Sequence, residues 1–194
     1  FFKLIMFNFT ISMKSFSNHF LISMPHIDDP FFSKSLIYMC ENNSKGSLGI
    51  IINKPIFSQN AAEILQQTGL EAIHPSPEIY LGGPVNIQMG LVLHDSNYKV
   101  EGTLSVSESI ALTSNKQIIS DLQLGNGPQK FRFSMGYAGW EKGQLETEIE
   151  NGDWLIMPAD IEFIFSFPDI EKWEIATTKL GIDISDLGGS AGIA

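Results

Sequence analysis

The chain has 194 residues, of which 43% are hydrophobic and 18% are charged. This composition excludes an extended disordered chain, and the length suits a single domain. Its 12 basic and 22 acidic residues give a formal net charge of −10, which disfavours general binding to nucleic acid or anionic membranes because both depend on Lys and Arg.

The N-terminal segment is apolar but short. Residues 1–12 are too few to span a bilayer, which takes ~20 such residues, and they lack the small-residue cleavage site of a secretory signal. Met13 offers a natural start of translation. We therefore interpret residues 1–16 as an extension outside the core and residues 17–194 as the domain. A membrane-surface anchor is the alternative interpretation of residues 1–12.

The first half of the chain predicts strands followed by a helix. Residues 19–24 form an apolar run that Pro25 ends, and residues 25–32 carry the Pro and Asp residues of a turn. Residues 35–41 and 48–53 predict a hairpin whose strands are apolar at successive positions, which indicates cover on both faces. Residues 60–69 predict a short capped helix.

The turn at 25–32 and the single cysteine each invite a chemical interpretation. His26, Asp28 and Asp29 are a possible metal or acid/base cluster, but no second ligand group stands at a recognised metal spacing, so we interpret the Asp residues as turn caps and expect no metal. Cys40 lies in an apolar run, with no neighbouring His or Lys to activate it. We interpret it as a buried structural thiol in a reducing compartment, the cytoplasm.

The motif Gly82-Gly83-Pro84 lies between predicted strands at 78–81 and 89–94. Such a turn could present backbone N–H groups to an anion, but the Lys and Ser/Thr of a phosphate-binding loop are missing. We prefer a tight turn with close backbone packing. His94 ends an apolar strand, and we interpret it as a hydrogen-bonded structural histidine.

The second half predicts further strands and two helices. Residues 95–109 read as a loop with a short strand, 130–137 alternate like a half-buried strand, and 160–165 fit neither pattern. The remaining elements are strands at 110–113 and 153–158, a helix opened by a capping box at 114–117, and an amphipathic helix at 168–181 with apolar positions 170, 173, 176 and 180.

The stretch with the most closely spaced candidate functional residues is Gly136–Ile149, which combines glycines, aromatics, an amide and carboxylates. Leu145 and Ile149 lie four apart, which predicts a helix beginning near Glu141. On that helix, the outward face would carry Glu141, Gln144 and Glu148. Carboxylates beside Trp140 and Tyr137 could serve as a general acid/base pair, but acids early in a helix also complement its positive end and stay solvated, which accounts for them.

Five motifs in fixed order resemble a known family. They are Met24-Pro25 with Asp29-Pro30-Phe31, then Gly49–Pro55, then Gly82–Val85, then the stretch from Gly136–Trp140 through Gly143–Glu146, Glu148-Ile149 and Trp154-Leu155 to Pro158-Ala159, and last Trp173 with Ala176, Leu180–Asp183, Leu187 and Gly192. In this order the chain closely resembles the YqgE/AlgH family of small bacterial proteins over residues 17–194. The family's common Gly-His-Ala ending appears here as Gly192-Ile193-Ala194, so any role of that histidine is absent.

The resemblance implies an α+β fold, a single compact domain in which a mixed, partly barrel-like β-sheet is surrounded by helices. Some members of the family are named as transcriptional regulators, although no established DNA-binding element accompanies the name. The chain has no basic helix-turn-helix, and its acidic charge disfavours nucleic acid as a partner.

The leading hypothesis is a cytoplasmic, non-enzymatic regulatory or binding protein whose partner is a protein or a small molecule, with no cofactor. Its predicted binding residues are Asn53, Gly82, Gly83, Pro84, Gly139, Trp140, Gln144 and Glu146. The first alternative is a small hydrolase-like enzyme that uses Glu146 or Glu148 with Asn53 or Gln144, although no catalytic motif is present. The second alternative is a transcriptional regulator.

Overall fold

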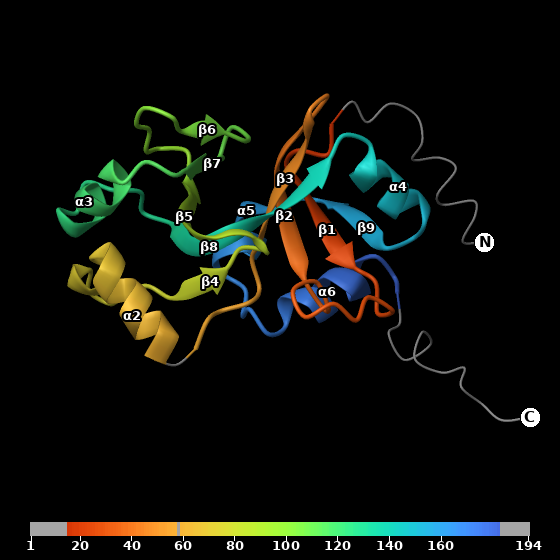
Figure 1. Cartoon of the computed structure of the whole chain (residues 1–194), viewed down its shortest axis with the longest axis horizontal. Coiled ribbons are helices and arrows are strands. Elements are labelled where there is room, and N and C mark those ends of the chain that lie inside the picture. The colour runs from red at the N-terminus through yellow and green to blue at the C-terminus, as the bar shows by residue number, and fades with distance from the viewer. Residues whose placement is uncertain (1–14, 58, 183–194) are drawn as a thin grey trace, which may run out of the picture.

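One long strand, β8 (Phe131–Glu141), runs through the middle of the sheet and joins its two halves (Figure 1). In this computed structural model, which describes residues 15–57 and 59–182, the first part of β8 pairs with β4 (Ile79–Leu81) and β5 (Val85–Asp95). Its last part pairs with β3 (Gly46–Ile51). Both halves of the sheet therefore take their positions from the same strand.

The nine strands of the described residues form one curled sheet in the order β6-β7-β5-β8-β3-β2-β1-β9, with β4 beside β8. The remaining strands are β1 (His19–Ser23), β2 (Leu36–Asn43), β6 (Leu104–Ser105), β7 (Ile110–Thr113) and β9 (Trp154–Pro158). All neighbours are antiparallel except β4 and β8, which are parallel. The sheet is thus mixed and curls into a partial barrel, and the α+β expectation is confirmed.

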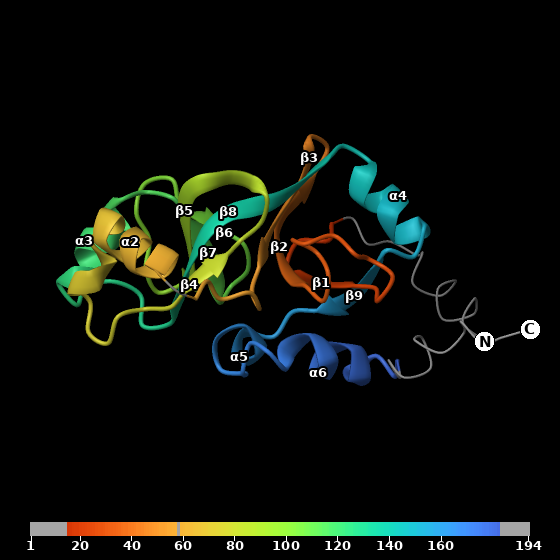
Figure 2. The same cartoon turned by 60° about the horizontal axis from the view of Figure 1, so that its bottom comes forward.

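Helices cover the sheet from several sides (Figures 1 and 2). They are α2 (Gln59–Thr68), the 3-10 turn η1 (Leu70–Ala72), α3 (Gln117–Gln123), α4 (Gln144–Glu150), α5 (Ile161–Phe165) and α6 (Lys172–Lys179). Helices α2 and α3 lie at one end of the molecule. Figure 2 shows α4 and α6 on opposite sides of β1 and β9 at the other end.

The two faces of β1 explain why its sequence is apolar at the successive positions 20–22. Phe20 and Ile22 belong to the cluster that packs on α5 and α6, whereas Leu21 belongs to the cluster under α4. The predicted cover on both faces of β2 and β3 is confirmed in the same way. Tyr38 and Ile37 of β2 divide between the two clusters, and so do Ile50 and Ile51 of β3. A third cluster packs the other half of the sheet against α2 and α3.

The helix predicted to begin near Glu141 begins later. Strand β8 continues through Trp140 and Glu141, which pair with Ser47 and Gly46. Gly143, at φ +78°, then turns the chain, and α4 starts at Gln144. The prediction was wrong because the spacing of the apolar residues does not show that a partner strand extends the sheet.

Two other local expectations needed correction, and one segment without a predicted structure forms a helix. The predicted apolar face at 168–181 is wrong at both ends, since Ile170 precedes α6 and is 89% exposed, and Leu180 follows α6 and is 38% exposed. The capping box at 114–117 does not form as predicted, since the carbonyl of the Asn115 side chain accepts the Gln117 N–H at 2.9 Å. Residues 161–165 form α5, and the carboxylate of Asp160, which precedes it, caps it by accepting the Glu162 N–H.

The chain termini are described only in part. Residues 1–14 and 183–194 lie outside the described residues, and with them our expectations for residues 1–12 and for Gly192-Ile193-Ala194. Phe16 packs against the cluster under α4, and its N–H donates to the Asn42 side chain at 3.0 Å. A domain boundary at residue 16 stays a prediction. Within the described residues, none of the helices has the length and apolarity needed to cross a membrane.

Candidate functional site

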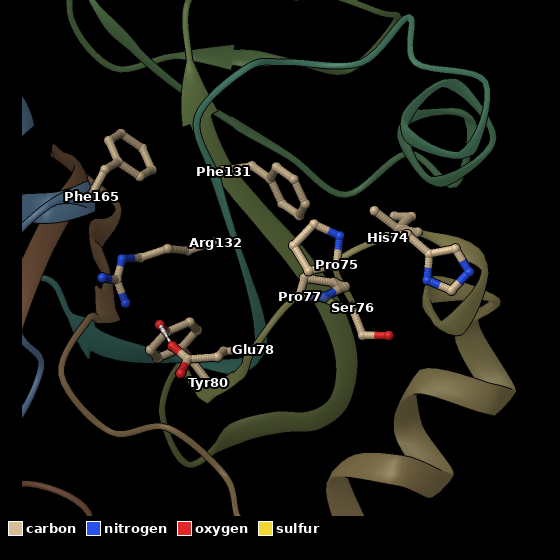
Figure 3. A pocket seen from close by; sticks show the side chains of 10 residues that line it. His74, Pro75, Ser76, Pro77, Glu78, Tyr80, Phe131, Arg132 and Phe165 are labelled. Carbon is tan, nitrogen blue, oxygen red and sulfur yellow. Dashed lines mark hydrogen bonds between the residues drawn. The ribbon is translucent and has the colours of Figure 1, made fainter.

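Two hollows mark the surface of the described residues. The first, which we call the Trp140 hollow, has a volume of about 300 Å³ and is lined by Ile27, Phe32, Gly139, Trp140, Gln144, Glu148, Asp153 and Trp154. The second, the Pro75 hollow, has a volume of about 390 Å³ and is lined by Ile73, His74, Pro75, Ser76, Pro77, Glu78, Tyr80, Phe131, Arg132 and Phe165 (Figure 3).

The turn after β8 builds the Trp140 hollow. Trp140 comes from the end of β8 and Trp154 from the start of β9, and α4 connects the two strands. Gly143 adopts φ +78°, a left-handed conformation that suits glycine. The helix that follows directs Gln144 and Glu148, four residues apart, along one side. The local sequence therefore places an amide and a carboxylate beside two indoles.

The Glu148 carboxylate is the centre of this arrangement. Its Oε2 accepts the indole N–H groups of Trp140 and Trp154, each at 2.8 Å. Its Oε1 accepts a hydrogen bond from Nε2 of Gln144 at 2.9 Å. The Gln144 side-chain oxygen in turn accepts the Glu141 N–H at 3.0 Å, which anchors the start of α4. All three donors to Glu148 are neutral, so none of them cancels its charge.

Aromatic rings form the walls of the hollow. The rings of Trp140 and Trp154 are 6.0 Å apart with an interplanar angle of 84°, and those of Phe32 and Trp154 are 5.7 Å apart at 86°. Both are edge-to-face arrangements, which aromatic pairs prefer over stacked ones. Phe32 is fixed from the other end, because its backbone N–H donates to the Asp29 carboxylate at 3.0 Å.

The turn that contains His26, Asp28 and Asp29 positions side chains at the Trp140 hollow. Asp29 caps the turn by accepting the N–H groups of Phe31 and Phe32, as predicted for a turn cap. His26 contacts the Asp153 carboxylate with Nε2 at 3.0 Å. The turn thus delivers Phe32 to the wall and His26 to the rim of the Trp140 hollow.

Three of the predicted binding residues, Gly139, Trp140 and Gln144, line this hollow together. Glu146 does not line it. It is exposed, and its carboxylate accepts a long contact of 3.4 Å from the Asn42 side chain.

The other predicted residues lie elsewhere and have structural contacts. The Asn53 side chain accepts the Leu36 N–H at 2.8 Å and donates to the Lys34 carbonyl at 2.9 Å, so it secures the start of β2. A Cβ atom on Gly83 would lie 2.2 Å from the Tyr137 carbonyl carbon. Gly82, Gly83 and Pro84 line neither hollow. The close backbone packing that we preferred for this turn is confirmed.

The Pro75 hollow borders a buried ion network that the sequence did not reveal. Figure 3 shows Arg132, Tyr80 and Glu78 at one side of the hollow and His74 to Pro77 at the other. The Arg132 guanidinium lies 4.3 Å from the centre of the Tyr80 ring and pairs with Asp169 at 2.9 Å. Lys172, whose side chain is fully buried, also pairs with Asp169 and donates to the Phe167 carbonyl at 2.8 Å.

Titration in this network follows from burial and pairing. Burial opposes ionisation of Asp169, but the hydrogen bond from Lys172 and the charge of Arg132 outweigh it and lower the pKa of that carboxyl. Burial lowers the pKa of Lys172, and its hydrogen bond to Asp169 offsets only part of that effect. The Tyr80 hydroxyl contacts the Glu78 and Asp169 carboxyls at 2.5 and 2.9 Å, and burial raises its pKa. The network ties α6 to β4 and β8.

Two buried groups singled out in the sequence have the expected structural roles. His94 is fully buried, and its ring nitrogens contact the Asp95 carbonyl at 2.7 Å and the Thr113 hydroxyl at 2.9 Å. Cys40 is 3% exposed, and burial raises the pKa of its thiol well above the usual value. Its expected character as an inert, buried thiol fits both facts.

Comparison with known proteins identifies the relatives of this chain. A family model described as AlgH-like matches residues 20–185. A UPF0301 protein of Marinomonas sp. is 42% identical over 181 residues, covering 92% of this chain and 96% of that protein. The UPF0301 protein AlgH of Pseudomonas aeruginosa is 40% identical, with coverage of 91% and 95%.

Solved structures agree with the fold. The solution structure of the AlgH protein from Pseudomonas aeruginosa superposes with a TM-score of 0.75 at 38% identity, covering 94% of this chain and 98% of that one. A crystal structure of a protein from Corynebacterium diphtheriae gives a TM-score of 0.68 at 20% identity, covering 90% and 92%. The second likeness shows the shared fold. The resemblance read from the sequence motifs is confirmed.

Proposed function

Since the chain belongs to the AlgH-like family, we propose that it is a non-enzymatic regulatory or binding protein whose contact site is the Trp140 hollow. We also place it in the cytoplasm, since its single cysteine is a buried thiol that suits a reducing compartment. Of the residues predicted for binding, the proposal keeps Gly139, Trp140 and Gln144. It adds Phe32, Glu148 and Trp154, which line the same hollow.

One observation carries the proposal. Side chains from the turn before β2 converge on the same hollow with side chains of the consecutive elements β8, α4 and β9, although that turn lies more than a hundred residues earlier in the chain. The hollow combines aromatic walls with an amide and two carboxylates, and recognition sites commonly have this composition of apolar walls with a few placed polar groups. Packing alone does not require the Gln144 amide and the Glu148 carboxylate to border open space.

The enzyme alternative has weaker support. It needs Glu146 or Glu148 together with Asn53 or Gln144. Gln144 and Glu148 do meet at 2.9 Å. Asn53 instead binds the backbone of Leu36 and Lys34, as described above. Among the described residues that line the Trp140 hollow there is no Ser, Cys, Lys or His to act as a nucleophile.

A role as a transcriptional regulator that binds DNA directly is also disfavoured. The formal charge of −10 opposes contact with phosphates, and the lining of the Trp140 hollow carries two acidic side chains. A regulatory role through a protein or small-molecule partner is compatible with both facts.

Partner capture tests the proposal. The full chain would be used as bait in a bacterial lysate, and a thermal-shift screen of metabolites would run in parallel, because a ligand of the folded state raises its stability. The blocking variant is Phe32→Ala, which removes one wall of the hollow. The matched control is Phe57→Ala, which removes an exposed ring that lies outside both hollows.

The variants need a check of folding by circular dichroism before the comparison. We expect Phe32→Ala to lose a partner or a stabilising metabolite that wild type and Phe57→Ala retain. Identical partner and metabolite sets for all three folded proteins would argue against the Trp140 hollow as the contact site.

A further inference from the structure

We propose that the Trp140 hollow takes an organic cation, either an alkylated ammonium or a guanidinium group. This inference rests on the proposed binding role and specifies the chemistry of the ligand. It follows from three properties of the hollow, namely the charge of its lining, the state of its hydrogen-bond donors and its aromatic walls.

The lining is negatively charged. Its ionisable side chains are Glu148 and Asp153, and among the described lining residues there is neither Lys nor Arg. The three hydrogen bonds to Glu148 all come from neutral donors, two indoles and an amide. These bonds hold the carboxylate in place and leave its charge uncompensated.

Among the described residues, His26 is the basic side chain that pairs with a carboxylate of this lining. It contacts Asp153 at 3.0 Å from the rim, where 57% of its side chain is exposed. With a neutral imidazole, the two carboxylates give the hollow a charge of −2, and with a protonated one the sum is −1. The hollow therefore stays negative in both states of His26, and a cationic ligand is attracted in both.

The hydrogen-bond donors and the aromatic rings of the lining also favour a cation over an anion. Both indole N–H groups are committed to Glu148, so the tryptophans have no N–H left to offer an anion. The aromatic surface that remains comes mainly from the half-buried ring of Phe32, and the small accessible parts of Trp140 and Trp154, 7% and 4% exposed, border it in edge-to-face arrangements near 90°. Ring faces attract ammonium and guanidinium groups, and the attraction grows when the group is desolvated.

The size of the hollow indicates a head group. At about 300 Å³ it lies at the lower end of the ~300–1,000 Å³ range of ligand pockets. A trimethylammonium or guanidinium group with a short stem matches this space. The same head group can belong to a free small molecule or to the side chain of a partner protein, and the experiment below separates these sources.

The three tryptophans of the chain provide the readout. In a ¹⁵N–¹H spectrum of the full chain, the indole signals of Trp140 and Trp154 report on the hollow. The indole of Trp173 donates to the Ser23 carbonyl at 2.9 Å, away from the hollow, and is the internal control. The first probe is choline, and its control is 3,3-dimethyl-1-butanol, a neutral molecule of the same shape.

The second probe is N-acetyl-arginine amide, and its control is the neutral citrulline compound. A short peptide with a central arginine forms the partner arm. We expect at least one cation to shift the Trp140 and Trp154 signals saturably and leave Trp173 in place, with an affinity about tenfold above that of its neutral control. Tighter binding of the peptide than of the free compounds assigns the head group to a partner's side chain.

Two variants check the electrostatic part. Asp153→Asn keeps the shape and removes one charge, and we expect it to weaken cation binding about two- to fivefold. Glu150→Gln removes a charge from an exposed position of α4, the helix that precedes Asp153, outside the hollow, and we expect no change in affinity.

Several outcomes would overturn the inference. Equal affinity for a cation and its neutral control, or no shift of Trp140 and Trp154 with either cation, would show that the hollow does not select organic cations. The partner capture with Phe32→Ala is independent of these probes. A loss of captured partner there, combined with no selection for cations here, would keep the proposed function and reject the ligand class.

Discussion

Replacing Glu148 by Ala tests whether its carboxylate holds the Trp140 hollow together. The change deletes the acceptor of the Trp140 and Trp154 indoles, each bonded at 2.8 Å, and of the Gln144 amide. Trp140 and Trp154 are only 7% and 4% exposed. An unsatisfied buried donor costs about 1–3 kcal/mol, so two of them give about 2–6 kcal/mol.

The size of the destabilisation depends on whether water can replace the lost carboxylate. The hollow is open to solvent, and a water that enters the space of the lost carboxylate can accept one of the indole hydrogens. We therefore expect the free energy of unfolding to fall by about 2–3 kcal/mol, in the lower part of the range for unsatisfied donors. The assay is urea unfolding followed by tryptophan fluorescence and analysed as a two-state transition.

The matched control is Glu150→Ala in the same helix. Glu150 is exposed and lies at the C-terminal end of α4, where an acid does not favour the helix dipole. Its removal should change the free energy of unfolding by no more than about 0.5 kcal/mol. If Glu148→Ala were as stable as Glu150→Ala, the three hydrogen bonds would contribute nothing measurable, and the account of this site would be refuted.

Three further predictions concern the rest of the fold. Asp169→Asn should destabilise the protein by about 3 kcal/mol in urea, because it weakens a buried pair with Arg132 and Lys172. Folding lowers the pKa of Asp169, so its contribution to stability is present above the unfolded pKa near ~3.9 and is lost as the pH falls through the folded pKa. The stability that the wild type loses in acid should therefore be smaller in the variant, and equal losses in the two proteins would contradict this. Gly83→Ala should lower the melting temperature far more than Gly102→Ala, because a Cβ at Gly83 meets backbone at 2.2 Å and one at Gly102 meets nothing within 4 Å. The Cys40 thiol, 3% exposed, should react with Ellman's reagent only on unfolding, and rapid labelling of the native chain would contradict its burial.

Local patterns were enough to predict most of the strands. Runs that are apolar at successive residues predicted β1, β2 and β3 with cover on both faces, and the structure has α5 and α6 on one face and α4 on the other. The alternation at 130–137 predicted the first part of β8, but it was wrong about the polar face, where Arg132 and Ser134 are only 7% and 1% exposed. These signals depend on neighbours within a few residues, which a sequence displays directly.

Features that depend on distant contacts were missed. The extension of β8 to Glu141 needs its partner β3, which the spacing of Leu145 and Ile149 does not encode. Arg132, Asp169 and Lys172 meet in the interior although the first is far from the others along the chain. Read locally, Arg132 was simply a polar residue of an alternating strand.

The candidate site was predictable in part for the same reason. Trp140 and Gln144 lie within one short segment, so their convergence follows from a strand, a glycine turn and a helix in succession. Phe32 reaches the hollow from a turn more than a hundred residues earlier. Asn53 was predicted to bind a partner, but its side-chain amide is occupied by the backbone of Leu36 and Lys34, which its position in the sequence does not show.

The most direct test of the Trp140 hollow as the contact site is a ¹⁵N–¹H spectrum of the indole groups, recorded with the partner or metabolite that the full chain retains. The account predicts that the signals of Trp140 and Trp154 shift on binding while that of Trp173 stays in place. Binding that leaves Trp140 and Trp154 unchanged, or that shifts Trp173 alone, would contradict it.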